Sequence, residues 1–279
     1  MTRPVNHRYT PLLLAAFFIA LGLILWGVLL GLNTRIVEYR VDVKSHPALE
    51  GLAGYRLAVV SDLHLRDDDS AFASWHRLIE EINGANPDYV LLLGDYSKAR
   101  SVDHNLHAFI DRFARSLDSF EAPLALVLGN YETWTDRQAW LAVLSARQTK
   151  VLENKVLRLD SPSKPLCVRG IGDHYTGKDR YLDFPPDCAE RAKVTITHDP
   201  AGVFAWDRNG LYLAGHTHCG QLQIPFLGVV WAPTEAPPEA RCGLYLDDGK
   251  VIFTSSGVGT SILPVRLLAR SQVEILAFD

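Results

Sequence analysis

Short apolar runs that each end in glycine or polar residues constrain the fold of this chain more than any other feature. The runs at 57–60, 89–93 and 124–128 read LAVV, YVLLL and LALVL. Such runs are typical of strands that are buried on both faces. Apolar residues at helical spacing follow each run, at 71–83, 102–117 and 135–146. Because crossovers between parallel strands are right-handed, this alternation predicts an open parallel sheet covered by helices.

Strand patterns dominate the second half of the chain, and one edge strand is expected within 33–54. The other predicted strands lie at 156–159, 166–171, 194–197, 211–213, 222–224, 243–246, 251–254 and 273–276. Asp247-Asp248-Gly249 is a hairpin signal between two of them. A second sheet packed on the first would bury the inner faces of both. The sequence therefore predicts a four-layer α/β/β/α sandwich.

An uncharged segment precedes this domain. Residues 11–32 read PLLLAAFFIALGLILWGVLLGL, and about 22 helical residues extend roughly 33 Å, enough to cross a bilayer core. The segment is longer than the apolar region of a signal peptide, and no A-x-A pattern follows it, so we interpret it as a retained transmembrane helix. Basic residues flank it on both sides and leave its orientation open. The predicted organisation is a flank at 1–10, an anchor at 11–32, a linker with an edge strand at 33–54 and a globular domain at 55–279.

Composition narrows the partners and the redox chemistry. The formal net charge is −4, so broad electrostatic binding of nucleic acid is not expected. The four cysteines form no C-x-x-C pair, which leaves free thiols and one or two disulfides as alternatives. Cys219 lies beside a histidine pair, where we interpret it as a small core residue rather than as a nucleophile.

Polar side chains follow the predicted strands at the points where the strands end. In open α/β sheets, ligands bind beyond the carboxyl ends of the strands, so these side chains are expected to meet at one edge. The stretch 211–221, LYLAGHTHCGQ, places two histidines between two glycines, whose flexibility allows both rings to fold inward. The expected donors are Asp62, His64, Asp95, Asn130, His198, His216 and His218.

These donors predict a metal centre. Imidazole, carboxylate and amide oxygen suit Mn, Fe, Zn or Co, and the thiolates of a structural zinc site are missing from the set. Seven donors exceed the needs of one four-coordinate ion. Two ions would use them all if one carboxylate bridged, as in two-metal phosphoester hydrolysis, and Asp95 is the expected bridge.

The ordered motifs resemble those of the calcineurin-like metallophosphoesterases. The family pattern is D-x-H, GD, GNH-[DE], H and GHxH, and the resemblance covers residues 55–279. The matching residues are Asp62-Leu63-His64, Gly94-Asp95, Gly129-Asn130-Tyr131-Glu132, His198 and Gly215-His216-Thr217-His218. The closing segment 257–261, with Pro264 and Arg266, is similar to the bacterial membrane-associated branch of the superfamily. That branch includes UDP-diacylglucosamine pyrophosphatases of lipid A synthesis.

The resemblance implies a fold, cofactors and a reaction. The fold would be the metallophosphoesterase sandwich, and the cofactors would be two divalent ions, with manganese favoured. Water would attack phosphorus in line, so no protein nucleophile is needed. One ion would be held by Asp62, His64, Asp95 and His218, and the other by Asp95, Asn130, His198 and His216.

Two residues raise separate questions of role. Tyr131 stands where the family usually has histidine, which is thought to stabilise the transition state or to protonate the leaving group. A phenol can donate a hydrogen bond but carries no positive charge, so we expect Tyr131 to be catalytic with an altered leaving-group preference; the alternative is that it only packs. Arg266 is expected to bind a substrate phosphate or carboxylate through its planar fork, with a surface ion pair as the alternative.

The sequence and the resemblance together predict a single-pass enzyme of the bacterial inner membrane, on an undetermined face. It would hydrolyse a phosphodiester or pyrophosphate bond in a lipid or lipid precursor such as a UDP-diacylglucosamine. The apolar loop 225–238, with Phe226 and Trp231, is expected to dip into the lipid interface, or else to pack on the domain. The expected partners are the bilayer and a phosphorylated lipid or small molecule. The alternatives are a non-catalytic metal-binding regulator and a phosphoesterase for soluble nucleotides; the oligomeric state is not predicted.

Overall fold

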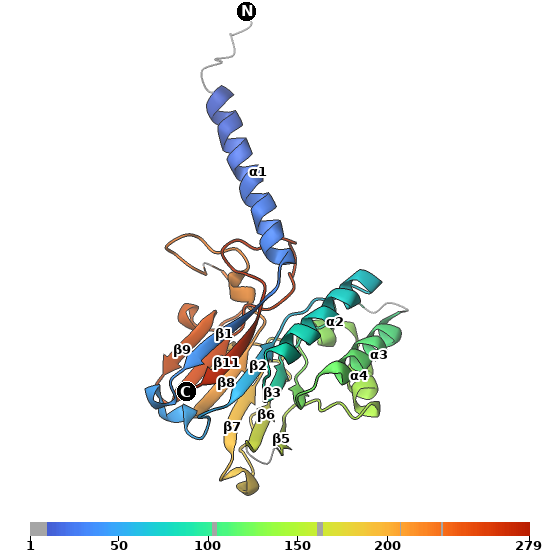
Figure 1. The fold of residues 1–279 in the computed structure, drawn as a ribbon, viewed down its shortest axis with the longest axis vertical. Helices are drawn as coiled ribbons and strands as arrows, with labels where there is room; N and C mark the ends of the chain where they lie inside the picture. Colours follow the sequence, from blue (N-terminus) through green and yellow to red (C-terminus); the bar gives the residue numbers. More distant parts are fainter. Residues whose placement is uncertain (1–9, 102–104, 161–163, 207, 230) are drawn as a thin grey trace, which may run out of the picture.

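The structure, a computed structural model, describes residues 10–101, 105–160, 164–206, 208–229 and 231–279. The predicted N-terminal flank lies outside the described residues except for its last position, and so do the first three residues of the helix predicted at 102–117. The described chain forms two sheets with helices on one side and a long helix that projects from the domain (Figure 1).

The first sheet has five strands in the order β1-β11-β2-β3-β4. Its strands are β1 (Arg35–Val41), β2 (Arg56–Val60), β3 (Tyr89–Leu92), β4 (Leu124–Leu126) and β11 (Gln272–Phe278). The parallel set predicted from the apolar runs is present as β2, β3 and β4. The sheet as a whole is mixed, because the C-terminal strand β11 lies between β1 and β2 and runs antiparallel to β2.

Three helices cover one face of this sheet (Figure 1). They are α2 (Asp69–Gly84), α3 (Leu106–Ser116) and α4 (Asn130–Ala146). In α2 the side chain of Asp68 accepts a hydrogen bond from the backbone N–H of Ala71, which caps the helix. The helix then buries Phe72, Trp75, Leu78, Ile79 and Ile82, whose spacing places them on one stripe against the sheet.

The second sheet has six strands in the order β5-β6-β7-β8-β10-β9. Its strands are β5 (Lys155–Leu159), β6 (Leu166–Gly170), β7 (Ala192–Ile196), β8 (Gly210–Ala214), β9 (Gly243–Asp247) and β10 (Lys250–Thr254). The inner faces of the two sheets share one core, which includes Leu57 and Leu91 from the first sheet and Val194, Leu213 and Phe253 from the second. Burial of these apolar faces joins the two halves of the chain into one domain.

The outer face of the second sheet departs from the prediction. It is covered by the four-residue helix α5 (Ala201–Phe204), whose Val203 packs with Tyr212 and Ile252, and by loops. The prediction of a strand at 222–224 is wrong, because Leu222 and Ile224 make only isolated bridges.

The remaining short elements are the 3-10 helices η2 (Val43–Ser45), η3 (Pro47–Leu49), η4 (Leu117–Ser119), η5 (Pro186–Cys188), η6 (His218–Gly220) and η7 (Pro238–Ala240).

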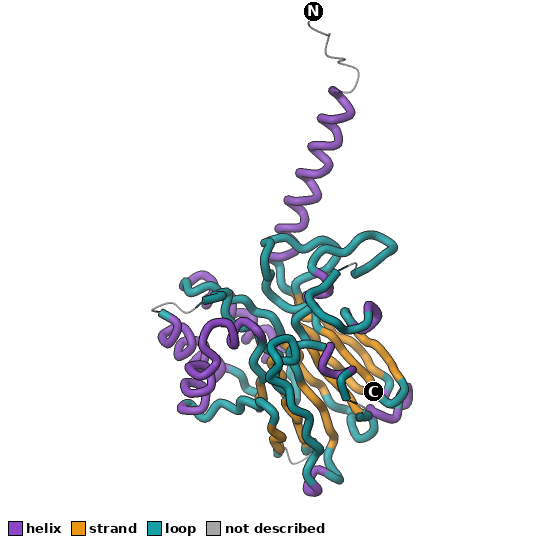
Figure 2. Tube along the Cα trace, turned by 180° about the vertical axis from the view of Figure 1, so that it is seen from behind, coloured by secondary structure: helices purple, strands orange, loops and turns teal. Residues whose placement is uncertain are grey.

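The uncharged N-terminal segment forms helix α1 (Thr10–Leu32). Its last turns rest on the segment 260–266: the N–H of Arg266 donates to the carbonyl of Gly27 at 2.9 Å, and a Cβ at Gly27 would lie 2.6 Å from Val265. The structure does not describe several side chains of α1. Among the residues that it does describe, no helix is long and apolar enough to cross a membrane. Figure 2 shows, from behind, the loops that gather at the base of α1.

The four cysteines form two disulfides, which resolves the alternatives left by the sequence. Cys167 on β6 bonds to Cys188 in η5, and Cys219 in η6 bonds to Cys242 just before β9. Cys219 is buried, as expected of a core residue, and as a bonded sulfur it cannot act as a nucleophile.

Candidate metal centre

All seven predicted donors meet at one edge of the two sheets. Asp62 and His64 follow β2, Asp95 follows β3, Asn130 begins α4, His198 follows β7, and the histidine pair follows β8. None of the seven is more than 5% exposed. Six of them form two groups, within each of which the ligand atoms all lie within 4.8 Å of one another. The first donor group is Asp62, His64 and His218, and the second donor group is Asp95, His198 and His216.

The first donor group brings two imidazoles and a carboxylate together. Nε2 of His64 lies 3.1 Å from Nε2 of His218, and Oδ1 of Asp62 lies 3.4 Å from the same nitrogen of His218. Burial lowers the pKa of both rings, and for His218 the charges of His64 and Arg266 lower it further. Both rings are therefore neutral near pH 7 and have a lone pair for a cation.

The second donor group includes the carboxylate expected to bridge. Nε2 of His198 lies 3.4 Å from Oδ1 of Asp95 and 3.2 Å from Nδ1 of His216. The amide oxygen of Asn130 lies 3.0 Å from the same Nε2, so Asn130 joins this group as its fourth donor. The other oxygen of Asp95, Oδ2, lies 3.7 Å from Nε2 of His64. One carboxylate thus presents an oxygen to each group, which is the arrangement that a bridge requires.

Backbone carbonyls fix which nitrogen of each ring in the second group faces the centre. Nδ1 of His198 lies 2.6 Å from the carbonyl oxygen of Leu93, and Nε2 of His216 lies 2.6 Å from that of Pro233. A carbonyl only accepts, so these nitrogens must carry the protons. The opposite nitrogens, 3.2 Å apart, then point lone pairs at each other, and two lone pairs at this distance need a proton or a cation between them.

The charge balance of the second group favours a cation. Burial opposes a proton on His198, yet the carboxylates of Asp95 and Asp62 raise its pKa well above the ordinary value. Negative charge that holds a proton on a buried ring also attracts a metal ion, which replaces the proton when it binds.

A buried atom without a hydrogen-bond partner points to the same conclusion in the first group. Oδ1 of Asp62 is buried and has no hydrogen-bond partner in the described structure. The other oxygen of Asp62 accepts from the Ser61 hydroxyl at 2.5 Å and from the His216 N–H at 3.0 Å. An unsatisfied buried carboxylate oxygen is costly, and a bound cation would satisfy it. The two buried groups therefore fit a dinuclear metal site.

Backbone strain is concentrated at the donors. Five of the seven adopt left-handed φ angles: 53° at Asp62, 43° at His64, 56° at Asp95, 67° at His216 and 50° at His218. Residues other than glycine adopt this region at a cost on the order of 1 kcal/mol or more, and such strain clusters at functional sites.

Close approach of two loops explains the glycines that precede Asp95 and Asn130. A Cβ on Gly94 would lie 2.6 Å from the backbone nitrogen of Gly129 and 2.8 Å from Nδ1 of His198. A Cβ on Gly129 would collide with the carboxylate of Asp95. Both glycines are therefore required for the carboxyl ends of β3 and β4 to deliver their donors to one centre.

Glu132 organises these loops, although the sequence reasoning gave it no role. Its carboxylate accepts from the backbone N–H groups of Asp95 at 2.9 Å, Tyr96 at 2.8 Å and Gly129 at 2.8 Å. Burial, and then the charge of Asp95, raises the pKa of Glu132. The signal was present in the sequence, because an acidic residue at the third helical position that reaches back to the N-cap is half of a capping box.

The prediction that Arg266 binds substrate is not what the structure shows. Arg266 is fully buried, and its guanidinium donates to the carbonyl oxygens of Ser256 at 2.9 Å and Gly257 at 3.1 Å, and to Gly259. It also lies 3.1 Å from Nδ1 of His218. The N–H groups of Arg266 therefore donate to backbone carbonyls and face the ring of His218, and Arg266 does not line the cavity.

Tyr131 lies at the centre, and a residue that the sequence reasoning missed lies next to it. The N–H of Tyr131 donates to Oδ1 of Asp95 at 2.9 Å, and its ring packs edge-on against His64 with centroids 4.5 Å apart. Its hydroxyl accepts from Nε and Nη2 of Arg100 at 2.9 and 2.7 Å. No motif marked Arg100 in the sequence, since the contact depends on how the loop after β3 folds back toward α4.

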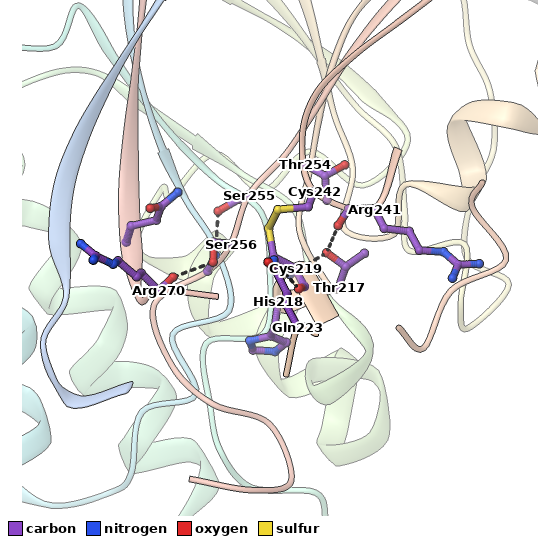
Figure 3. Close-up of a disulfide and its surroundings, with 12 residues drawn as sticks. Thr217, His218, Cys219, Gln223, Arg241, Cys242, Thr254, Ser255, Ser256 and Arg270 are labelled. Carbon is purple, nitrogen blue, oxygen red and sulfur yellow. Dashed lines mark hydrogen bonds between the residues drawn. A yellow bond between two sulfur atoms is a disulfide. The ribbon is translucent and has the colours of Figure 1, made fainter. Parts of the chain in front are cut away.

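A disulfide fixes the loop that carries the histidine pair. Figure 3 shows the Cys219–Cys242 bond beside His218. The hydroxyl of Thr217 donates to the carbonyl of Arg241 at 2.8 Å, which ties the same two segments together again. These two links fix the backbone at His218, and the contact with Arg266 fixes its ring.

A cavity of about 760 Å³ opens over the centre. Its lining includes the donors Asp95, Asn130, His216 and His218 and the aromatic residues Tyr131, Trp134 and Tyr175, which we call the aromatic wall. The apolar residues that line it, which we call the apolar wall, are Leu222, Ile224, Trp231, Ile262, Leu263 and Leu267. Buried polar donors beside apolar lining residues suit a substrate with a charged group and a large apolar part.

The chain is similar to known proteins in sequence and in fold. The sequence model for calcineurin-like phosphoesterase matches residues 55–220, more than half of the chain and the part that contains all seven donors. The chain is 28% identical over 240 residues to phosphodiesterase YaeI of Escherichia coli (strain K12), covering 81% of this chain and 83% of that protein. It is 27% identical over 262 residues to a transmembrane protein with metallophosphoesterase domain of Danio rerio.

The coverage of these relatives differs. The match to the second relative covers 86% of this chain but 56% of that protein, so the chain spans little more than half of its length. Among solved structures, a dimetal phosphatase from Danio rerio is similar with a TM-score of 0.46 and 12% identity, over 74% of this chain and 88% of that one.

Proposed function

The chain belongs to the calcineurin-like phosphoesterase family, and from that premise we propose that it is a two-metal hydrolase of phosphodiester or pyrophosphate bonds in a lipid-like substrate at a membrane. That it is a metal-dependent phosphoester hydrolase follows from the family and from its phosphodiesterase relative. The observation that carries the finer proposal is the cavity, which joins two buried donor groups to a largely apolar wall.

We assign the seven predicted donors as metal ligands. The first donor group with one oxygen of Asp95 would hold one ion, and the second donor group with Asn130 would hold the other. Two divalent ions, with manganese the first choice, would supply an activated water and neutralise charge on the phosphoryl oxygens. The chain's own contribution is to fix the rings by the carbonyls of Leu93 and Pro233 and to seat Asp95 through the N–H of Tyr131.

The apolar wall continues onto the surface beside α1. Phe226 is fully exposed, and Leu227, Trp231, Ile262 and Leu263 are each more than half exposed. A large exposed apolar patch marks an interaction site for a membrane, a ligand or another protein. We propose that α1 anchors the domain and that these residues contact the bilayer interface, so that a lipid reaches the centre from the membrane side. The proposed location is the bacterial inner membrane.

The aromatic wall supports a second substrate class. Trp134 and Tyr175 are exposed, with ring centroids 6.1 Å apart, and Tyr175 also contacts His216. Exposed aromatic rings stack on nucleobases, so a soluble nucleotide diester is the alternative substrate. A nucleotide-linked lipid precursor of the UDP-diacylglucosamine type would use both walls.

Metal-dependent turnover is the first test. The full chain in detergent with Mn²⁺ should hydrolyse bis(4-nitrophenyl) phosphate, and a chelator should abolish the reaction while added Mn²⁺ restores it. Turnover that persists in chelator would contradict the two-metal assignment. A complete lack of turnover with Mn²⁺, Fe²⁺, Zn²⁺ or Co²⁺ would favour a non-catalytic metal-binding regulator.

Substrate class is tested by removing the exposed apolar residues. Phe226→Ser with Trp231→Ser should lower kcat/KM for a UDP-linked lipid in mixed micelles at least about tenfold, because two large side chains no longer contact the micelle. Hydrolysis of the soluble aryl diester should stay within about twofold. Leu244→Ser is the matched control, since Leu244 is an exposed apolar residue on β9 outside the cavity. Equal losses on both substrates would remove the membrane contact, and faster hydrolysis of soluble nucleotides than of lipid would favour the alternative.

A further inference from the structure

Arg100 stands at the wall of the cavity without an acidic partner. It lies in the loop after β3, five positions beyond Asp95, and lines the cavity together with Tyr131 and Trp134. Among the residues that the structure describes, no carboxylate lies within ion-pair distance of its guanidinium, whereas other arginines such as Arg112 and Arg137 have one. An unpaired guanidinium that lines a pocket is suited to bind a phosphoryl group.

Tyr131 determines where this guanidinium lies. Its hydroxyl accepts two hydrogen bonds, from Nε at 2.9 Å and from Nη2 at 2.7 Å, and Nη2 also approaches the hydroxyl of Ser261 at 3.5 Å. The guanidinium carbon lies 5.2 Å from the centroid of the Tyr131 ring and 6.0 Å from that of Trp134. These contacts orient a side chain that would otherwise be one of the most mobile at a surface.

The remaining donors of Arg100 are open to a ligand. A guanidinium has five N–H groups, and in the described part of the chain Nη1 has no hydrogen-bond partner. The Tyr131 hydroxyl, which receives two N–H groups, keeps its own hydrogen to donate to Ser261, 3.1 Å away, or to a bound oxygen. The pair thus offers a positive charge and an O–H donor side by side.

We propose that Arg100 is a catalytic residue that binds the phosphoryl group and stabilises the negative charge on the leaving oxygen, with Tyr131 as the residue that positions it. The inference rests on the proposed hydrolysis of phosphoesters. It accounts for the departure from the family motif, because the neutral phenol of Tyr131 recruits the positive charge that a histidine at that position could carry itself.

The reaction step is a simple displacement. A bond forms between phosphorus and the oxygen of water, and the bond from phosphorus to the leaving oxygen breaks, with its electron pair going to that oxygen. The two protons of water end on the products or in solvent. Arg100 transfers no proton; its charge lowers the free energy of the developing oxyanion, so its effect is largest for leaving groups that depart with most difficulty.

Leaving-group dependence and phosphate affinity test the proposal. The variants Arg100→Ala, Arg100→Lys and Tyr131→Phe are compared with the wild type as full-length, Mn²⁺-loaded protein, using phenyl phosphodiesters that release either 4-nitrophenolate or phenolate. Arg100→Ala should lower kcat/KM for the phenolate ester at least about tenfold more than for the 4-nitrophenolate ester. By calorimetry, it should also weaken the binding of inorganic phosphate about tenfold.

The other variants separate charge from position. Arg100→Lys should recover part of the phosphate affinity, because it keeps a point charge without the fork. Tyr131→Phe should give a smaller loss than Arg100→Ala, and the double variant should be within about twofold of Arg100→Ala alone, because both act through one guanidinium. Arg112→Ala, which removes an arginine paired with Asp69 outside the cavity, should match the wild type in every measurement.

Two outcomes are distinguishable. If the wild type shows metal-dependent turnover but Arg100→Ala keeps the wild-type phosphate affinity and leaving-group ratio within about twofold, the role of Arg100 is overturned and the proposed hydrolysis stands. If the wild type shows no turnover, the proposed function fails, and phosphate calorimetry alone decides whether Arg100 binds an anion. Thermal midpoints and metal content that equal those of the wild type confirm that each variant is folded and loaded.

Discussion

The two donor groups differ in what holds their histidines. In the second group, backbone carbonyls of Leu93 and Pro233 fix the rings, and neighbouring carboxylates raise the pKa of His198. In the first group, the guanidinium of Arg266 lies 3.1 Å from the ring of His218 and helps to lower its pKa. The second group thus has rings whose orientation is fixed by the backbone and carboxylates that favour a cation. The first group has the buried positive charge of Arg266 next to one of its rings. We therefore expect the second group to bind a divalent cation more tightly.

The largest effect is expected where the groups meet. Asp95→Asn removes a charge that faces both groups, at 3.4 Å from His198 and 3.7 Å from His64. Loss of several kcal/mol of charge stabilisation should lower kcat/KM for an aryl diester by about 10³-fold or more. Calorimetric titration with Mn²⁺ should show both affinities weakened.

The control for that variant is a carboxylate at the opposite edge of the first sheet. Asp88 precedes β3 and bonds to Lys164 and to the N–H of Arg56. Asp88→Asn should retain both Mn²⁺ affinities. If Asp95→Asn weakened only one affinity, Asp95 would not be shared between the groups.

The two disulfides provide a matched pair of tests of the first group. Replacing Cys219 and Cys242 by serine should cost about 2–5 kcal/mol of unfolding free energy and should also weaken the more weakly bound Mn²⁺, because His218 precedes Cys219. Replacing Cys167 and Cys188, whose bond closes a loop of similar length, should cost similar stability without changing either affinity. Urea unfolding and Mn²⁺ titration measure the two effects; equal Mn²⁺ affinities in both double variants would remove the link to His218.

Arg266 sharpens the contrast through its contact with His218. Arg266→Met keeps much of the buried volume but removes the donors to Ser256, Gly257 and the ring of His218. We expect the more weakly bound Mn²⁺ to lose about 10- to 100-fold in affinity, the usual effect of losing a residue that orients a ligand, and the tighter one to change little. Arg266→Lys should recover little, because a single ammonium cannot replace the fork. A loss confined to the tighter affinity would reverse the assignment of the groups.

The smallest effect is expected at Glu274. It lies next to the segment 256–257, whose carbonyl oxygens accept hydrogen bonds from Arg266. Burial raises its pKa to about 7, although Ser255 and the N–H of Ser256 donate to it. A carboxyl whose pKa is raised on folding contributes its stability below the unfolded pKa and loses it as pH rises through about 7. Glu274→Gln should therefore gain stability relative to the wild type by roughly 1–2 kcal/mol between pH 6 and pH 8. Urea unfolding of Mn²⁺-saturated protein at both pH values measures this difference, and a difference that shrinks with pH would contradict the raised pKa.

The donor groups could be predicted because their positions depend on local pattern. Apolar runs such as 57–60 and 89–93 become buried parallel strands, and parallel strands deliver the residues that follow them, Asp62 and Asp95 among them, to one edge. Two loops approach each other closely at that edge. Gly94 and Gly129 mark this approach in the sequence, because a Cβ at either position would collide with the other loop. Most of the metal centre could therefore be predicted from the order of strands and polar residues along the chain.

The supporting contacts depend on distant segments and were not predictable in the same way. Arg266 reaches His218 only because the C-terminal segment passes beside the centre, and β11 inserts between β1 and β2 rather than adding to an edge. The pairing of Cys219 with Cys242 and the contact of Arg100 with Tyr131 likewise join segments that carry no periodic signal. Tertiary packing selects these partners from many chemically equivalent ones.

Anomalous diffraction from crystals soaked in Mn²⁺ tests the central claim most directly. At saturating Mn²⁺, two anomalous peaks should flank Asp95, one among Asp62, His64 and His218 and the other among Asn130, His198 and His216. At limiting Mn²⁺, the second of these peaks should be the stronger. Peaks elsewhere, or a single peak at saturation, would contradict the assignment of a dinuclear centre to these residues.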